Sequence, residues 1–167
     1  PPTGNPGSDE EQPDQLAKYL AGLIGSASND LVLVTAYLVP TPELLAAIGT
    51  AHQRGVRIRI LTNSIRSNNH LAAHAAYTGY IEELLAAGAE LFEVRADARD
   101  RHHYMRDPVA EKLLGLHAKF MLIDSDKSFV GSSNLDPRSL KLNTEVGLLV
   151  SSEKFNSALR SAIEIDF

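Results

Sequence analysis

The chain has 167 residues, of which 44% are hydrophobic and 22% are charged, and its formal net charge is −5. This composition is typical of a globular protein with one core, and the acidic balance argues against a large non-specific nucleic-acid surface. Because cysteine is absent, disulfides and thiolate metal sites are excluded. The longest mainly apolar run, residues 31–39, is far shorter than the about 20 residues of a membrane-spanning helix.

The first residues have the composition of a linker. Residues 1–13 contain four of the eight prolines, together with glycine, serine and acidic residues. We therefore expect a disordered linker at 1–13 and one catalytic domain at 14–167. Since the chain begins with Pro1 and not with methionine, we expect it to be the carboxyl-terminal half of a longer protein.

The hydrophobic pattern predicts alternating helices and strands. In chain order it predicts a helix over 14–25, a strand over 31–37, a helix over 42–54, a strand over 56–61, a helix over 70–87, strands over 90–94, 116–124, 128–131 and 145–150, and a helix over 153–165. Thr41 before Pro42 forms a helix start, and Gly55 ends that helix. Arg57 and Arg59 alternate with apolar residues, so one face of their strand is expected to be solvated.

This order of elements predicts an α/β fold. The strands before residue 95 alternate with helices, which implies right-handed crossovers and parallel pairing. The turn at 125–127 predicts a hairpin between the next two strands. We therefore expect a central mixed, largely parallel sheet with helices on both faces.

Ligands bind beyond the carboxyl ends of parallel strands, so several loops are expected to share one rim. These loops are 39–41, 62–69 and 96–107. Thr62 and Asn63 are possible rim residues. His70 and His74 lie one helical turn apart, but without an apparent third metal ligand we expect them to be helix-surface residues. The basic stretch 99–106 is expected to be a solvated loop, with a head-group or metal site as the alternative.

The strongest signal is a set of six residue types at fixed offsets. Its order is His117, one residue, Lys119, four residues, Asp124, six residues, and then Gly131, Ser132, one residue and Asn134. Alternate residues of a strand share a face, so His117 and Lys119 should project together, as should Ser132 and Asn134. A hairpin that pairs them would gather an imidazole, an ammonium, a hydroxyl and an amide. Such donors suit a phosphodiester, whose non-bridging oxygens stay charged during a displacement.

This spacing reproduces the signature H-x-K-x4-D-x6-G-S-x-N, and on it the chain is identified as a member of the phospholipase D superfamily. Other stretches resemble the second catalytic half of bacterial cardiolipin synthases. They are residues 37–40, 60–64, 83–93 and 134–145. The resemblance extends over residues 14–167 and implies a phospholipase D-like half-domain that uses no metal and no other cofactor.

The resemblance implies a role for each matching residue. His117 is expected to be either the nucleophile or the general acid. Lys119, Ser132 and Asn134 are expected to bind the phosphate. Glu145 is expected to orient and polarise a histidine through its other ring nitrogen, with a surface carboxylate at a strand end as the alternative.

Two further residues have alternative roles. Asp124 belongs to the catalytic motif, but its odd spacing from His117 places it on the opposite face of the strand, where we expect it to hold the hairpin. Arg138, another possible rim residue, would either bind phosphate or form a structural salt bridge with Asp136 or another neighbour.

The single H-x-K of the chain limits what it can do alone, because the superfamily mechanism needs two motif histidines. We expect the second to come from an upstream domain or from a second subunit. The leading hypothesis is a phosphatidyltransferase that forms a phosphohistidine and makes cardiolipin from phospholipids. The alternatives are a nuclease or other phosphodiesterase that is active as a homodimer, and a non-catalytic half-domain that supports a partner.

The leading hypothesis also implies partners and a location. The substrate would be a phospholipid, and nucleic acid is not expected as a partner. The full-length protein would contact the cytoplasmic side of the membrane peripherally.

Overall fold

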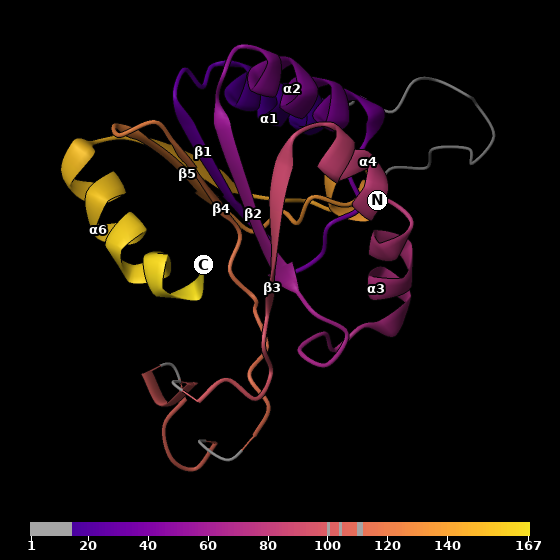
Figure 1. Ribbon diagram of the computed structural model, residues 1–167, viewed down its shortest axis with the longest axis vertical. Coiled ribbons are helices and arrows are strands. Elements are labelled where there is room, and N and C mark those ends of the chain that lie inside the picture. Colours follow the sequence, from indigo (N-terminus) through magenta and orange to yellow (C-terminus); the bar gives the residue numbers. More distant parts are fainter. Residues whose placement is uncertain (1–14, 100, 104, 110–111) are drawn as a thin grey trace, which may run out of the picture.

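The computed structural model describes residues 15–99, 101–103, 105–109 and 112–167, so the expected linker at 1–13 lies outside the described residues. In chain order the elements are α1 (Gln15–Gly25), β1 (Asp30–Val34), α2 (Pro42–Gln53), β2 (Arg57–Asn63), α3 (Leu71–Thr78), α4 (Ile81–Ala86), β3 (Ala89–Val94), the 3-10 helix η1 (Arg101–His103), β4 (Phe120–Ile123), β5 (Lys127–Gly131), α5 (Pro137–Lys141), β6 (Gly147–Ser151), α6 (Glu153–Ile163) and the 3-10 helix η2 (Glu164–Asp166). A six-stranded sheet forms the centre of the molecule (Figure 1).

The sheet is mixed, as the sequence predicts. Its strand order is β3-β2-β1-β4-β5-β6. The pairs β1–β2 and β2–β3 are parallel, whereas β1–β4, β4–β5 and β5–β6 are antiparallel. The parallel part is therefore limited to β1, β2 and β3, because the predicted hairpin β4–β5 adds its strands next to β1 in the opposite direction.

Helices cover both faces of the sheet. Helices α1, α2 and α4 pack on one face, where Leu33 and Ile60 are buried, and α6 packs on the other, where Val32 and Leu122 are buried (Figure 1). Strand β1 contributes to both clusters, which explains its continuous apolar run. Each fully buried aliphatic side chain of this kind stabilises the fold by about 1.5–3 kcal/mol. The expected helices on both faces are confirmed.

The expectation of a solvated face on β2 is correct for Arg57 and wrong for Arg59. Arg57 is exposed and bonds Glu90 through Nε at 2.7 Å and Nη2 at 2.8 Å. Arg59 is only 6% exposed. Its guanidinium lies 3.1 Å from Glu164 and 4.8 Å from the centre of the Phe167 ring. The end of the chain covers this face of β2, which the alternation within the strand does not reveal.

The predicted helix over 70–87 is two helices. It is interrupted at Gly79 and Tyr80, between α3 and α4. Glycine is disfavoured inside a helix by about 1 kcal/mol, and each helix has its own buried side chain, Tyr77 in α3 and Leu84 in α4. The change of direction lets both of these side chains reach the core while α3 stands away from the sheet (Figure 1).

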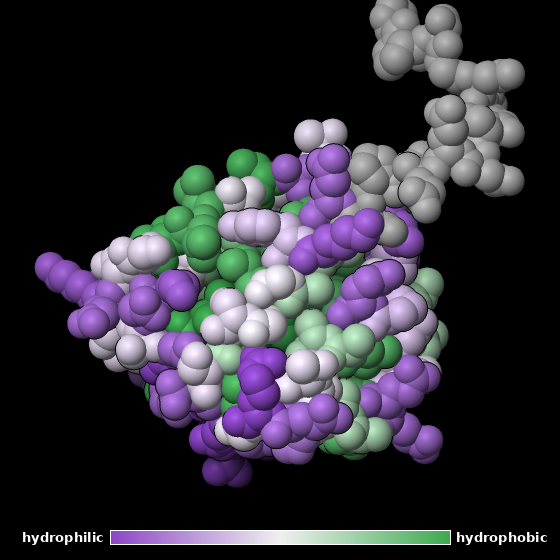
Figure 2. Space-filling model, turned by 90° about the horizontal axis from the view of Figure 1, so that it is seen from above, coloured by the Kyte–Doolittle hydropathy of each residue, from purple (hydrophilic) through white to green (hydrophobic). Residues whose placement is uncertain are grey.

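Strand β6 lies at one edge of the sheet and exposes apolar side chains. Leu148 and Leu149 in the strand are 66% and 43% exposed, and Val146 just before the strand is 70% exposed. In the view from above, one group of hydrophobic residues lies at the upper left, and others are interspersed with polar residues in the centre and on the right (Figure 2). An unpaired strand edge with apolar side chains is a surface that can pair with another chain or domain.

Candidate active site

The hairpin brings the two parts of the motif together at the carboxyl end of β1. The residue pairs Val34–Phe120 and Phe120–Val130 align β1, β4 and β5. The Gly131 N–H donates to the Lys119 carbonyl at 3.1 Å. Strand β4 begins only at Phe120, so the motif residues before it lie in the segment that leads into the strand and not within it. The hairpin thus brings the backbones of the two motif parts together, and the convergence of the four side chains stays a prediction.

His117 and Lys119 contact each other directly. Lys119 Nζ lies 3.0 Å from His117 Nδ1 and donates to the His117 carbonyl at 2.7 Å. Burial lowers the pKa of Lys119, and the carboxylates of Glu145 and Asp136 act in the opposite direction. An ammonium group has donors only, so a charged Lys119 makes Nδ1 the acceptor and leaves the ring proton on Nε2.

Ser132 and Glu145 form a second cluster. Ser132 Oγ donates to Glu145 Oε2 and accepts from the Val146 N–H at 3.0 Å, while Asn143 Nδ2 donates to Glu145 Oε1 at 3.2 Å. No hydrogen bond joins Glu145 to a histidine within the described residues. The carboxylate is nevertheless close enough to act on the charge of Lys119. Orientation of a histidine by Glu145 stays a prediction.

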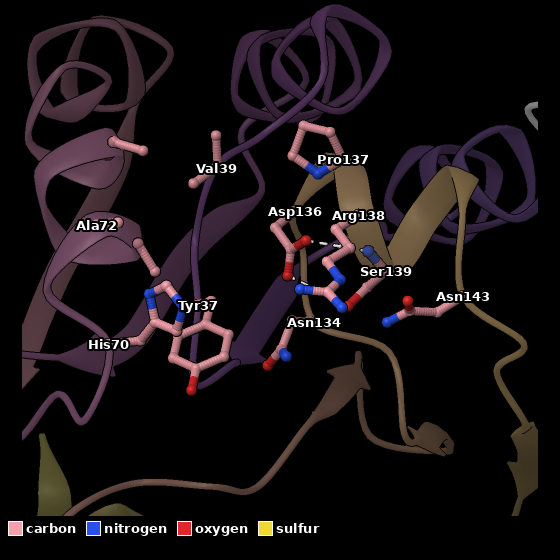
Figure 3. Close-up of a pocket in the computed structure, with 12 residues that line it drawn as sticks. Tyr37, Val39, His70, Ala72, Asn134, Asp136, Pro137, Arg138, Ser139 and Asn143 are labelled. Carbon is pink, nitrogen blue, oxygen red and sulfur yellow. Dashed lines mark hydrogen bonds between the residues drawn. The ribbon is translucent and has the colours of Figure 1, made fainter.

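Asn134 and Arg138 line a cavity of about 520 Å³ next to the motif (Figure 3). The remaining lining residues are Tyr37, Val39, His70, Ala72, Ala73, Ala76, Asp136, Pro137, Ser139 and Asn143. Arg138 makes no salt bridge with Asp136, whose carboxylate accepts from Ser139 N–H at 3.0 Å and from Ser139 Oγ at 3.2 Å. The salt bridge between Arg138 and Asp136 is therefore not formed, and phosphate binding by Arg138 stays a prediction.

Asp124 lies at the far end of β4 from His117. Its carboxylate accepts the backbone N–H groups of Ser28, Asn29 and Asp30 at 2.7–3.2 Å. Burial acts to raise the pKa of Asp124, but these hydrogen bonds outweigh it and hold the pKa below its usual value. The motif aspartate thus ties the hairpin to the start of β1, away from the imidazole.

Replacing Asp124 with asparagine should lower the free energy of unfolding at pH 7 by about 1.5–3 kcal/mol, the range for hydrogen bonds to a charged group. Urea unfolding measures this, and Asp126→Asn in the same turn is the control. The folded pKa is depressed, so the charge stabilises the fold above the unfolded pKa of about 3.9 and this stabilisation is lost as the pH falls through the lower folded value. Equal stability of wild type and Asp124→Asn at pH 7 would contradict the role of the carboxylate.

The possible rim residues Thr62 and Asn63 are both buried. Asn63 Nδ2 donates to the carbonyls of Ala36 at 3.0 Å and Leu116 at 2.9 Å, and Asn63 Oδ1 accepts from the Leu116 N–H at 2.8 Å. These bonds hold the backbone immediately before His117 against the end of β1. Asn63 is therefore in a position to orient the motif histidine, and not to meet a ligand in solvent.

Among the described residues, no group of three or more His, Asp or Glu is arranged to hold a metal ion. His70 lines the cavity and packs edge-on against Tyr37 at 6.0 Å between ring centres, whereas His74 packs against Tyr77. In the part of the chain that the structure describes, no helix is long and apolar enough to cross a membrane.

The sequence analysis placed Val39 in an expected rim loop, but it did not single out Tyr37 or the alanines of α3 as cavity residues. Tyr37 follows the carboxyl end of β1, so the rule that ligands bind beyond strand ends could have found it. For the alanines of α3 no such signal exists, because Ala72, Ala73 and Ala76 are unremarkable in a helix.

Two solved structures define the class of fold. Nuc from Salmonella typhimurium, a phospholipase D family member, superposes with a TM-score of 0.65 at 19% identity and covers 89% of this chain and 84% of its own. NucT from Helicobacter pylori superposes with a TM-score of 0.68 at 18% identity and covers 92% of this chain and 88% of its own. The fold is that of the phospholipase D proteins.

Sequence comparison gives the family. Residues 20–166 match the family described as cardiolipin synthase, PLD-like domain, and the chain belongs to it. It is 36% identical over 140 residues to cardiolipin synthase C of Escherichia coli (strain K12), covering 83% of this chain and 29% of that protein. It is 35% identical over 142 residues to cardiolipin synthase A of Klebsiella pneumoniae (strain 342), covering 85% of this chain and 25% of that protein. The chain thus spans less than a third of these relatives.

Proposed function

We propose that the protein is a phosphatidyltransferase that joins two phospholipids into a cardiolipin-type lipid. The observation that carries this proposal is that the backbone positions of His117, Lys119, Ser132 and Asn134 lie at one end of the hairpin, in a chain 36% identical to a cardiolipin synthase. The proposed substrate is a phospholipid, which the full-length protein would meet by peripheral contact with the cytoplasmic side of the membrane.

The proposed reaction has two displacements at phosphorus. In the first, Nε2 of one histidine attacks the donor phosphodiester, the bond from phosphorus to the head-group oxygen breaks, and that oxygen takes a proton from a second histidine. In the second, a hydroxyl oxygen of the acceptor lipid attacks phosphorus, its proton returns to the second histidine, and the phosphorus–nitrogen bond breaks. The products are a cardiolipin-type lipid and the released head-group alcohol.

His117 supplies one of these two histidines. The contact of Lys119 Nζ with Nδ1, at 3.0 Å, holds the ring in place, and both roles, nucleophile and general acid, stay open for His117. Lys119 and the Asn134 amide would neutralise and bind the phosphoryl oxygens.

The second histidine would come from another phospholipase D-like half that faces this one. The β6 edge is a suitable contact surface because it exposes Val146, Leu148 and Leu149 and adjoins the motif through the hydrogen bond from the Ser132 N–H to the Val146 carbonyl at 2.9 Å. A second half that binds at the β6 edge would cover these apolar side chains and would also bring the second histidine to the site.

A phosphodiesterase that is active as a homodimer is the second candidate. Its support is that Nuc and NucT are matched over 84% and 88% of their own lengths, so a single domain of this fold makes up most of each chain. The higher identity to cardiolipin synthases supports the lipid substrate over this alternative.

The test is an assay of the full-length protein on vesicles of phosphatidylglycerol. We expect one cardiolipin and one glycerol for each transfer, and an unchanged rate in EDTA, because Lys119 and neutral donors take the place of a metal cation. Linear double-stranded and single-stranded DNA are assayed in parallel. Cleavage of DNA without lipid transfer would replace the proposal by the second candidate, and loss of transfer in EDTA with recovery on adding one divalent ion would contradict the metal-free chemistry.

A further inference from the structure

The cavity between α3 and α5 extends the site well beyond the transferred phosphate (Figure 3). Its volume, about 520 Å³, lies within the range of roughly 300–1,000 Å³ that small-molecule sites occupy. The wall on α3 is made of the small apolar side chains Ala72, Ala73 and Ala76, and Val39 and Pro137 add further apolar lining. The short side chains of α3 leave room for an aliphatic stem of a ligand.

Across the cavity from α3 lies the cationic side chain of Arg138. Figure 3 shows the Arg138 side chain beside Asn134, across the cavity from Tyr37 and His70. The guanidinium has no hydrogen bond and no ion pair with any described residue, and Asp136 is already bound by Ser139. A planar guanidinium with unused donors binds a phosphodiester in a bidentate manner.

Asn134 supplies a second, independent feature. Its side chain is only 8% exposed, and Oδ1 has no hydrogen-bond partner. A phosphate oxygen cannot satisfy this acceptor, but a hydroxyl group can donate to it. The ligand that fits therefore combines a hydroxyl, a nearby anionic phosphodiester and a short aliphatic stem.

We propose that this cavity is the acceptor subsite, and that it selects an alcohol that carries its own phosphodiester. The inference rests on the proposed function. One hydroxyl of the acceptor glycerol attacks phosphorus as described above, and the neighbouring hydroxyl donates to Asn134 Oδ1. Arg138 binds the phosphodiester on the other side of that glycerol, and the lipid stem lies along the alanines of α3.

Competition between two soluble acceptors tests the role of Arg138. The full-length protein receives a phospholipid donor with labelled acyl chains, together with glycerol and glycerophosphoglycerol in the same vessel. The ratio of the two transfer products depends only on the acceptor step, because the donor step is common to both. In Arg138→Gln, preference for glycerophosphoglycerol should fall about 10- to 100-fold, as expected for losing a hydrogen bond to a charged group. The matched control Lys141→Gln, on the same helix, should change the ratio less than about twofold.

The apolar wall is tested separately by Ala76→Leu, which fills the cavity, against Ala75→Leu, which adds the same volume to a part of α3 that does not line it. Ala76→Leu should reduce transfer to phosphatidylglycerol relative to hydrolysis by water at least about 10-fold, while Ala75→Leu leaves this partition unchanged. Melting temperatures confirm that all four variants fold.

The outcomes separate the two proposals. If wild type transfers the label to glycerol but Arg138→Gln keeps the full preference for the anionic acceptor, the acceptor subsite is refuted and the phosphatidyltransferase stands. Equal loss with both acceptors would assign Arg138 to the transferred phosphoryl group and refute the subsite as well. If wild type transfers the label to no alcohol at all, the proposed function fails and the subsite fails with it.

Discussion

Replacing His117 with alanine in the full-length protein is expected to reduce phosphatidyl transfer by at least about 10²–10⁴-fold, the contribution of a positioned general acid. If His117 is the nucleophile, the loss is larger, because no covalent intermediate can form. Initial rates of cardiolipin formation at saturating phosphatidylglycerol measure the effect. The fold should persist, since the His117 side chain is exposed and outside both core clusters.

His103→Ala is the matched control for this experiment. His103 is also exposed, and it lies in η1, on the loop that follows β3. Its removal should leave the rate within about twofold, as for most surface substitutions away from a site. An His117→Ala enzyme that keeps more than a tenth of the wild-type rate would show that another group performs the chemistry.

The second large effect concerns the proposed second histidine. The 167-residue chain alone, held as a monomer, should turn over phosphatidylglycerol about 10²–10⁴-fold more slowly than the full-length protein, because the leaving alkoxide has no proton donor or the phosphorus has no nucleophile. Adding a separately produced upstream half should restore the rate. His117→Ala in the added mixture should abolish the restored activity.

A concentration series distinguishes a separate upstream half from pairing of identical chains. If two copies of this chain make up the site, the rate of the isolated chain rises with the square of its concentration while monomers predominate. If an upstream half is needed, the isolated chain stays inactive at every concentration. Activity that is high and proportional to the concentration of a species shown by light scattering to be monomeric would mean that one histidine is enough.

Much of the candidate site follows from local spacing. The interval from His117 to Lys119, the turn at 125–127 and the interval from Ser132 to Asn134 place four polar residues at one end of a hairpin, and the structure has this hairpin. Such spacing is informative because residues in a hairpin are neighbours both in sequence and in space. The apolar run of β1 is also a local signal. Because successive side chains of a strand point to opposite faces, a continuous apolar run predicts that both faces of β1 are buried.

Contacts between segments that are distant in the sequence could not be predicted from local spacing. Arg59 alternates like a surface residue, but the carboxyl end of the chain, more than a hundred positions later, covers it through Glu164 and Phe167. The helix over 70–87 looks continuous, but the positions of Tyr77 and Leu84 against the core divide it. In both cases the burial of one segment is set by another segment distant in the sequence.

The sequence by itself therefore determined the family, the α/β class and the motif at the end of the hairpin, because these depend on short-range periodicity and fixed offsets. Only the tertiary structure decided that Arg138 forms no ion pair with any described residue, that Asn63 holds the backbone before His117, and that the alanines of α3 and Asn134 line one cavity. Pairing and cavity volume are properties of side chains that meet from distant parts of the chain, so no local pattern encodes them.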